Sequence, residues 1–521
     1  MPRFVTSVMR ATAACALCAV LLIAPALAQD AVLASASFAT PPPTSSRTAF
    51  LTAEQQRADL DVLRSALTQL HPGLYRYHTE ASLDQAMDQL AAAWATSETL
   101  GDAYLALSQF LATIKCGHTY ANFWNQSDEL QAELFAPVRT LPFAFRLIGE
   151  RMVVTWSVDE AAGLPVGTEV TAIDGHAVPE LIETLKAYVK ADGSNDGKRI
   201  DNLQVTGFGM FEAFDVYFPL RFPATDGQYT LSVKRPGATD TETVSVEAIT
   251  RTERGERYSA QHGEAATTYD DLWQFELLGD GAAYLQIGTF VTWRLEMDWK
   301  AFLRDAFTQL REHNVEHLVI DLRGNEGGDN DVNNMLMMAL ASQPLHLAPV
   351  EQRAQYDVMP EALRPHVTLW NEALLDVRNM VEDTGNGYFR LRGGSEAGRT
   401  LRANPDAYAG SVYLLVGASN SSATFALTTA LQDAGVATVI GQETGGNKRG
   451  INGGQYVNLH LPNAGIEVDI PLIAYFPVGE MPADEGLMPD IVVQQQVTDV
   501  IEAHDPERAA AMALIAKARG E

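Results

Sequence analysis

The sequence predicts an α/β protein of several parts, and three observations support this prediction. The chain has 521 residues, more than one ordinary hydrophobic core accommodates. From about residue 270 onward, strand and helix patterns alternate, which is typical of helices packed on a sheet. A helical region and a strand-rich region come before it. We therefore expect an α/β core at 270–495, preceded by a helical domain at 48–125 and a β-rich module at 135–255.

The composition is that of a folded, acidic protein. Hydrophobic residues make up 46% of the chain and charged residues 20%. Lys and Arg number 37 against 66 Asp and Glu, a formal charge of -29. A surface this acidic repels the phosphates of nucleic acids and anionic lipids, so we expect neither as a partner.

The N-terminus predicts an export signal at residues 1–28. Arg3 and Arg10 supply positive charge, "AACALCAVLLIAPA" is an apolar run too short for a bilayer span, and Ala26-Leu27-Ala28 fits a cleavage site. The small, proline-rich segment 29–47 then predicts a flexible linker. We expect a periplasmic or secreted mature protein without stable membrane insertion.

Cysteine usage excludes an internal disulfide in the mature chain. Cys15 and Cys18 lie in the predicted signal, which leaves Cys116 alone. Stability must then come from burial of apolar side chains.

The helical domain begins at "TAEQQRADLDVLRSALTQLHPGLY", where Leu60, Leu63, Leu67 and Leu70 follow helical spacing and His71-Pro72-Gly73 ends the helix. Two further helical stretches, "SLDQAMDQLAAAWATS" and "GDAYLALSQFLATIK", lead into "CGHTYANF". In the β-rich module, "RLIGERMVVTWSV" predicts a hairpin, "EVTAI" a strand, and "QYTLSVKR" with "TETVSVEAI" a second strand pair.

The α/β core contains an interruption and a closing helix. Residues 345–408 form an irregular, partly helical insertion, which we interpret as a cap over a cleft. Residues 496–521 predict a C-terminal helix.

Two strand-to-helix turns, which we call elbows, are candidates for parts of a catalytic site. One is rich in glycine and the other in serine. "VIDLRGNEGGDN", residues 319–330, brings bare backbone N–H groups to the carboxyl end of a strand, where α/β folds place ligands. In "LLVGASNSSATFALTTALQDAG" a buried strand ends and Ser422-Ala423 opens a helix, whose N-terminus favours negative charge. The structural alternatives are a glycine turn and a serine N-cap, and Ser419 and Ser421 fit such roles better than Ser422.

His118 is a third candidate, because it follows a glycine in a loop at the end of the helical domain and is free to face another domain. A lone histidine is more often structural. Cys116 is a weaker candidate nucleophile, since side chains two residues apart rarely converge on one substrate atom.

In this order the stretches resemble the tail-specific, or C-terminal-processing, serine peptidases, the family that includes the tricorn protease core. The resemblance covers most of the chain after about residue 50 and lies in "DLDVLRSALTQLHPGLY", "IKCGHT", "GLPVGTEVTAIDGHAV", "AAYLQIGTF", "LVIDLRGNEGG", "SNSSATFALTTALQDAGVATVIGQETGG" and "LPNAGIEVDIPL" to "EGLMPDIVV". It implies a crotonase-like α/β core and a PDZ-like role for the β-rich module.

The resemblance also assigns roles. Ser422 would be the nucleophile, and backbone N–H groups of Ala423 and of Gly327 or Gly328 would form the oxyanion hole. One branch of the family activates its serine with a lysine that ends a "T-x-G-K" stretch, whereas the tricorn-like branch uses a histidine supported by a carboxylate.

The base is expected to be His118. Asn447 occupies the lysine position of the family, and Lys448 comes one residue late. A one-residue shift on a strand turns a side chain to the opposite face, and lysine needs strong desolvation before it can act as a base. His118 in "CGHT" matches the histidine of the tricorn-like branch.

The supporting carboxylate is left open among three residues of "GEMPADEGLMPDI". Spacing from the serine favours Glu480, whereas closeness to Pro489 favours Asp484 and Glu485. Gly117 also departs from the tricorn-like pattern, which has a serine before the histidine.

These observations predict an exported serine endopeptidase that cleaves peptides or unfolded proteins, with no metal and no organic cofactor. A non-catalytic protein that binds peptides or apolar ligands is the alternative, motivated by the missing lysine, by Gly117, and by Phe425 where many family members carry glutamate. An esterase or amidase acting on small molecules would use the same residues.

Overall fold

The computed structural model describes residues 51–521, except 159–163, 207–211, 264–267 and 394–397. The predicted export signal and linker therefore lie outside the described residues.

A six-stranded sheet forms the centre of the α/β core, in the order β21-β17-β16-β9-β8-β7. All neighbouring strands are parallel except the edge pair β7–β8. The strands are β7 (Trp273–Gly279), β8 (Ala282–Ile287), β9 (His317–Asp321), β16 (Ser411–Val416), β17 (Ala437–Gly441) and β21 (Ile491–Val492). The predicted α/β fold class is confirmed, and the carboxyl ends of β9 and β16 lie side by side.

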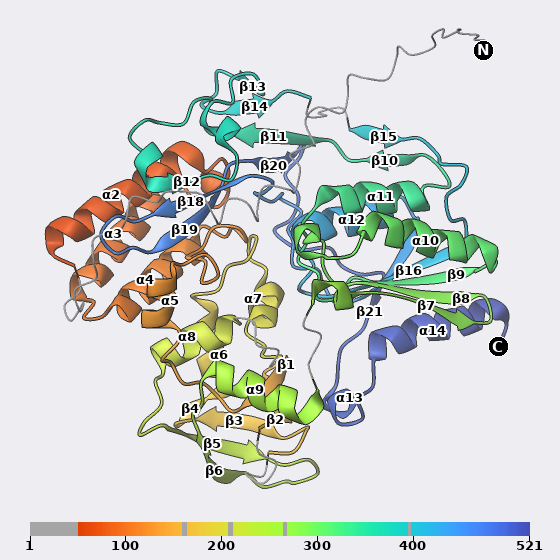
Figure 1. Ribbon diagram of the computed structural model, residues 1–521, viewed down its shortest axis with the longest axis horizontal. Coiled ribbons are helices and arrows are strands. Elements are labelled where there is room, and N and C mark those ends of the chain that lie inside the picture. Colours follow the sequence, from red (N-terminus) through yellow and green to blue (C-terminus); the bar gives the residue numbers. More distant parts are fainter. Residues whose placement is uncertain (1–50, 159–163, 207–211, 264–267, 394–397) are drawn as a thin grey trace, which may run out of the picture.

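Helices cover both faces of this sheet (Figure 1). The apolar sides of α10 (Trp299–Glu312), α11 (Asn330–Leu340) and α12 (Ser422–Asp433) pack on one face. On the other face, Ala511 and Ile515 of α14 (Pro506–Arg519) meet the strands. We expected one closing helix, but the structure has a separate α13 (Val497–Ile501), because Asp505 caps a new helix that begins at Pro506.

The helical domain contains α2 (Ala53–Leu70), α3 (Glu80–Thr96), α4 (Leu100–Thr113) and α5 (Asp128–Leu134). Threonines begin the first three helices: Thr52, Thr79 and Thr99 each accept a hydrogen bond from the third helical residue in a reciprocal capping box. A short 3-10 turn, η2 (Leu74–Arg76), follows the predicted stop at His71.

The β-rich module is one antiparallel sheet with the order β1-β2-β3-β5-β6. The predicted hairpin is β1 (Phe143–Ile148) with β2 (Arg151–Ser157), and the second predicted pair is β5 (Gln228–Lys234) with β6 (Glu242–Glu247). The other elements are β3 (Glu169–Ile173), β4 (His176–Ala177), α6 (Val178–Lys186), α7 (Asp196–Asn202), α8 (Ala213–Arg221) and α9 (Arg251–His262). Helix α7 extends from the module toward the α/β core (Figure 1).

The insertion at 345–408 differs from the expectation of partly helical structure. Its described residues form short strands that pair with each other and with β20 (Ala474–Pro477), and its helical residues are confined to 3-10 turns. These elements are β10 (Leu345–Leu347), β11 (Val350–Ala354), η6 (Arg364–His366), β12 (Val367–Thr368), η7 (Glu372–Leu375), β13 (Val381–Asp383), β14 (Phe389–Leu391) and β15 (Arg399–Leu401). Turns between such short segments leave no room for a regular helix.

A late hairpin joins the helical domain. β18 (Tyr456–His460) and β19 (Glu467–Pro471) pair with each other, and their buried side chains belong to the same apolar cluster as α2, α3 and α4. Asp59 of α2 accepts hydrogen bonds from the backbone N–H groups of Asn463 (3.0 Å) and Ala464 (2.7 Å) in the turn of the hairpin. Residues some 400 positions apart thus share one core.

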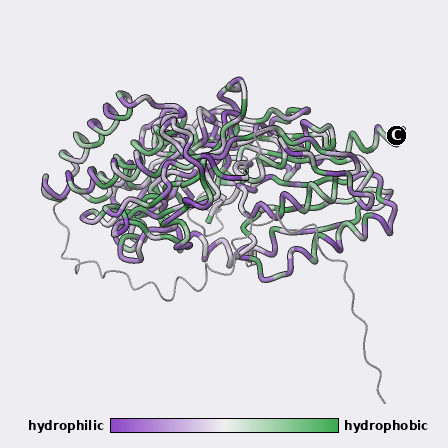
Figure 2. The backbone as a smooth tube through the Cα atoms, turned by 90° about the horizontal axis from the view of Figure 1, so that it is seen from above, coloured by the Kyte–Doolittle hydropathy of each residue, from purple (hydrophilic) through white to green (hydrophobic). Residues whose placement is uncertain are grey.

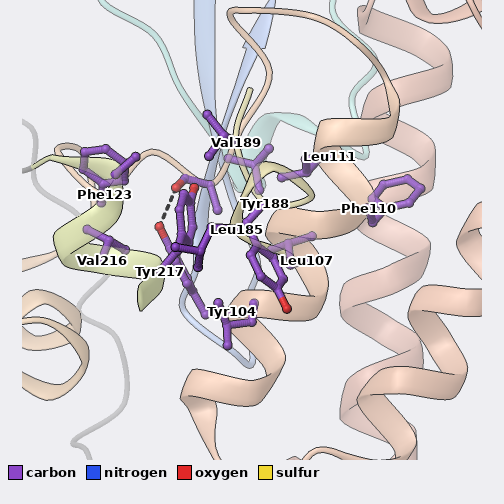
Figure 3. Close-up of a cluster of buried hydrophobic side chains, with 14 of the residues drawn as sticks. Tyr104, Leu107, Phe110, Leu111, Phe123, Leu185, Tyr188, Val189, Val216 and Tyr217 are labelled. Atoms are coloured by element: carbon purple, nitrogen blue, oxygen red, sulfur yellow. Dashed lines mark hydrogen bonds between the residues drawn. The ribbon is translucent and has the colours of Figure 1, made fainter. Parts of the chain in front are cut away.

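The helical domain and the β-rich module also pack directly on each other. Figure 3 shows side chains of α4, among them Tyr104 and Leu107, against Leu185 of α6 and Tyr217 of α8. Polar and apolar residues are interleaved along the described helices and strands (Figure 2). Among those residues, no helix has the length and apolar character needed to cross a membrane.

Candidate active site

Ser422 stands at a strained position at the start of α12. Its φ is +50°, a left-handed value that costs a residue with a side chain about 1–3 kcal/mol and is concentrated at functional sites. Ser421 occupies the N-cap position, but its side chain does not cap the helix. Ser421 Oγ instead donates to the carbonyl of Glu326 at 3.1 Å. The half-buried Ser422 is therefore not explained by ordinary helix capping.

The glycine elbow lies directly against this serine. A Cβ atom on Gly327 would lie 2.9 Å from both Ser422 Cβ and the backbone nitrogen of Ala423. Gly327 has φ +107° and Gly328 has φ +137°, and a Cβ on Gly328 would lie 2.3 Å from the carbonyl oxygen of Phe290. Only glycine fits at these two positions.

The backbone N–H groups around Ser422 differ in availability. Gly327 donates its N–H to Asn325 Oδ1 at 2.8 Å. The N–H groups of Gly328 and Ala423 donate to no acceptor within the described parts of the chain. Of the predicted donors, Gly328 and Ala423 are therefore free to bind an oxyanion, whereas Gly327 provides the close approach.

Buried asparagines hold the two elbows together. Asn420 Nδ2 donates to the carbonyls of Leu322 (2.5 Å) and Asn325 (3.0 Å), and Asn325 Oδ1 also accepts from Thr424 Oγ1 at 2.8 Å. Both asparagines are fully buried. Their bonds fix the ends of β9 and β16 relative to each other.

His118 comes to this region from the loop after α4. Its ring lies beside Tyr456, with 5.6 Å between ring centroids, and its Nδ1 is buried without a hydrogen-bond partner among the described residues. Burial lowers the pKa of His118, an effect that the charge of Asp192 opposes. The charge of Glu326 also raises the pKa of His118, and the backbone carbonyl of Glu326 accepts a hydrogen bond from Ser421 Oγ. No hydrogen bond joins His118 to Ser422 in this structure.

Asp192 is the carboxylate beside His118 that the sequence analysis missed. It is buried, and its Oδ1 accepts the N–H of Gly117 at 2.8 Å. A Cβ on Gly117 would lie 2.9 Å from Asp192 Oδ2, so the glycine that departs from the tricorn-like pattern makes room for this carboxylate. The departure at Gly117 was the available signal, but it did not indicate which residue fills the space.

The three predicted carboxylates take other positions. Glu480 is exposed. Asp484 accepts from Ser194 Oγ and from Asn447 Nδ2, both at 2.8 Å. Glu485 pairs with Lys448 at 2.8 Å. None of the three hydrogen-bonds to His118 within the described residues.

The "ETGGNKRG" loop is braced by the β-rich module. Asn447 is fully buried, and its side-chain Nδ2 donates a hydrogen bond to Asp484. Gly193 lies beside this amide, and a Cβ atom on Gly193 would lie 2.1 Å from Asn447 Nδ2. Asn195 Nδ2 donates to the carbonyl of Thr444 at 2.7 Å. Lys448 is partly exposed and bound to Glu485. The loop thus supports the site without presenting a lysine to Ser422.

A different lysine, Lys198 of α7, reaches the serine elbow and was not predicted. Its buried Nζ donates to the Ser419 carbonyl at 3.0 Å and pairs with Glu326 at 2.5 Å. Burial by itself would raise the pKa of Glu326, but Lys198 and Lys190 lower it. Because the Glu326 side chain is 54% exposed, the ion pair with Lys198 outweighs burial, and the pKa of Glu326 is lowered. Lys198 Nζ thus donates a hydrogen bond to a backbone carbonyl and pairs with a carboxylate, an arrangement that does not suit a base.

Comparison with known proteins identifies the core. Residues 281–493 match the family described as Peptidase family S41. The core of this chain is similar to that family. The match includes both elbows around Ser422 and supports a serine-type peptidase acting on peptides or proteins.

Solved structures show the same fold. The structure of mature CPAF complexed with lactacystin is 16% identical, with a TM-score of 0.61, and the match covers 90% of this chain and 99% of that chain. Another structure of mature CPAF is 17% identical, with a TM-score of 0.57, and the match covers 86% of this chain and 94% of that chain. No curated protein sequence matches the chain significantly. The likeness in fold to these structures therefore extends beyond residues 281–493 to the helical domain that carries His118.

Proposed function

We propose that this protein is an exported serine endopeptidase of the tail-specific type, which hydrolyses peptide bonds of peptides or unfolded proteins. One observation carries the proposal: Ser422 has φ +50° and lies against Gly327, and the backbone N–H groups of Ala423 and Gly328, which follow these two residues, have no other acceptor among the described residues. Such donors stabilise the oxyanion that forms when a serine attacks a carbonyl. The PDZ-like module, through α7, would help to orient the substrate.

In the proposed reaction, Ser422 Oγ attacks the scissile carbonyl while neutral His118 removes its proton. The negative charge that develops on the carbonyl oxygen is bound by Gly328 and Ala423. His118⁺ then protonates the leaving amine, and water hydrolyses the acyl-enzyme by the same steps. Because His118 and Ser422 are not hydrogen-bonded in this structure, substrate binding would have to bring them into contact.

We assign the supporting carboxylate to Asp192 in place of Glu480, Asp484 or Glu485. Among the charges around His118, that of Asp192 has the largest effect on the His118 pKa. This negative charge favours the imidazolium that forms during catalysis. The bonds of Asp484 and Glu485 to Asn447 and Lys448 give them a role in bracing the loop.

The test replaces one serine at a time. Ser422→Ala should reduce peptide hydrolysis at least about 10³-fold, the scale expected for loss of a nucleophile, with unchanged thermal unfolding. Ser421→Ala is the matched control, because it is the adjacent half-buried serine and should remain active. A fluorophosphonate that labels active serines should modify Ser421→Ala but not Ser422→Ala.

Unchanged hydrolysis in Ser422→Ala would refute the nucleophile. Absence of both hydrolysis and labelling in the wild-type protein, with peptide binding retained, would instead support the non-catalytic binding protein. Phe425, which motivated that alternative, packs against Gly446, where a Cβ would lie 2.3 Å from the Phe425 ring. A panel of simple esters beside peptides separates an esterase from a peptidase.

A further inference from the structure

Three side chains with metal-binding atoms gather beside the candidate active site. They are Cys116, His118 and Asp192, and their ligand atoms all lie within 4.8 Å of one another. Cys116 and His118 come from the loop after α4, and Asp192 comes from the loop before α7. The cluster therefore joins the helical domain to the β-rich module.

The environment of the cluster is not explained by packing alone. Cys116 and Asp192 are 1% and 3% exposed. His118 Nδ1 is buried and has no hydrogen-bond partner among the described residues, although buried polar atoms are nearly always paired. A buried ring nitrogen without a partner, beside a thiol and a carboxylate, is a ligand atom that a cation can use.

We propose that Cys116, His118 and Asp192 form an inhibitory zinc site. A thiolate, an imidazole and a carboxylate are the ligand types that Zn²⁺ binds in proteins, and three protein ligands leave a fourth position for water or a substrate group. Zinc lies about 2.0–2.3 Å from such ligands, so donors already within 4.8 Å of one another need to close by only roughly 1 Å. Binding displaces the proton of the Cys116 thiol to solvent, and no oxidation or reduction takes place.

The charges around the cluster predict moderate, reversible binding. Asp192 and Glu326 favour a cation near His118, whereas Lys190 and Lys198 oppose it. The inhibitory effect rests on the proposed function: a zinc ion on one ring nitrogen of neutral His118 leaves the ring hydrogen on the other nitrogen, so the imidazole has no lone pair with which to accept the proton of Ser422. The zinc site itself is independent of that function.

Binding is measured on the full chain carrying Ser422→Ala, in which the three ligands are intact and no peptide hydrolysis is expected. Zn²⁺ titrated in competition with a chromogenic chelator should bind at one equivalent. Adding Cys116→Ala should weaken that binding about 100-fold, and Asp192→Asn should weaken it at least tenfold. His504→Ala is the matched control, because His504 pairs with Asp499 at 2.8 Å on the surface without a cysteine, and it should bind zinc as the parent does.

Cobalt provides a second measurement that a purely structural role of Cys116 would not affect. Co²⁺ at the site should give the intense near-ultraviolet absorption of a thiolate bound to cobalt, and Cys116→Ala should abolish it. Less than one equivalent of bound zinc, unchanged affinity in Cys116→Ala, or cobalt binding without the thiolate band would each overturn the site. Circular dichroism of each variant identifies misfolding, and if Cys116→Ala misfolds, Cys116→Ser replaces it.

Inhibition is then tested on the wild-type protein with a peptide substrate. Zinc at the concentration that fills the site should suppress hydrolysis, a chelator should restore it, and the zinc sensitivity of Cys116→Ala, relative to its own basal rate, should fall about 100-fold. Binding without inhibition would overturn the inhibitory role. A wild-type protein without hydrolysis would refute the proposed peptidase but not the zinc site, because binding is measured separately.

Discussion

At the scale of the residue, the absence of a side chain at Gly117 leaves space for the carboxylate of Asp192. Of the charges around His118, that carboxylate has the largest effect on the His118 pKa. The negative charge of Asp192 raises the pKa of His118, against the larger opposing effect of burial. In the proposed mechanism, Asp192 is thus a positioning residue that acts through His118.

Asp192→Asn should lower kcat/KM about 10²-fold and move the acidic limb of its pH profile to lower pH. The reason is that loss of the carboxylate charge further lowers the pKa of His118 and destabilises the imidazolium. The profile is measured for wild type, Asp192→Asn and the control Asp484→Asn. A shift in Asp484→Asn but not in Asp192→Asn would assign the supporting role to Asp484.

Lys448→Met tests the identity of the base. Hydrolysis should continue at a rate within a few-fold of wild type, and stability should change by no more than about 1 kcal/mol, because the Lys448–Glu485 pair is partly exposed. Since burial lowers the pKa of His118, the wild-type rate should rise with pH through a region below 6.5. Loss of activity in Lys448→Met, with a rate that rises only above about pH 9, would contradict the assignment of His118.

At the scale of the element, β19 places two carboxylates, Glu467 and Asp469, on one face of a hairpin, opposite to its core side chains Val468 and Ile470. Burial, and then the charge of Asp469, raise the pKa of Glu467 to about 7 from its ordinary 4.5. The folded protein therefore holds the Glu467 proton more tightly than the unfolded chain does. The resulting stability is present below pH 4.5 and is lost as the pH rises through 7.

Glu467→Gln should therefore stabilise the protein by about 1–3 kcal/mol at pH 8 and change it little at pH 4.5, because glutamine resembles the protonated acid. Thermal unfolding at the two pH values measures the difference. Glu247→Gln is the control, since Glu247 is exposed on β6 and should show no such pH-dependent gain. An equal effect of Glu467→Gln at both pH values would argue against the raised pKa.

The elements that the sequence predicted have local signals. The leucine spacing and the stop at His71-Pro72-Gly73 indicated α2, and the glycine and serine elbows indicated the ends of β9 and β16. What the sequence could not supply were contacts between distant segments: Asp192 beside His118, Lys198 at Ser419, and β20 pairing with β11. The periodicity of hydrophobic residues predicts local helices and strands, but it does not indicate which loop of one domain contacts a loop of another domain.

At the scale of the whole molecule, the candidate site requires parts that lie outside the S41 match. His118 and Asp192 precede residue 281, and Lys198 reaches the serine elbow from α7. The buried side chains of Val457, Leu459, Val468 and Ile470 from the late hairpin pack in the cluster that contains the N-terminal helices. The catalytic core is therefore not a self-sufficient unit.

A fragment of residues 270–521 should consequently fail to unfold cooperatively and should bind a dye that reports exposed apolar surface. Its late hairpin would expose the four side chains that the helical domain normally covers. Adding residues 51–262 as a second chain should restore cooperative unfolding and peptide hydrolysis. A fragment that unfolds at the wild-type temperature and hydrolyses peptides alone would show that the core is autonomous.

The pairing of Asp59 with the hairpin at Asn463 and Ala464 also constrains when the protein can fold. The two partners are separated by 405 residues in the Asp59–Ala464 bond, so the first helices to leave the ribosome must wait for nearly the whole chain before their core is complete. Until then their apolar faces remain open to chaperones, to aggregation and to proteases. In the proposed mechanism, His118 and Ser422 would therefore come together in one late step, and topology alone would keep partly synthesised chains inactive.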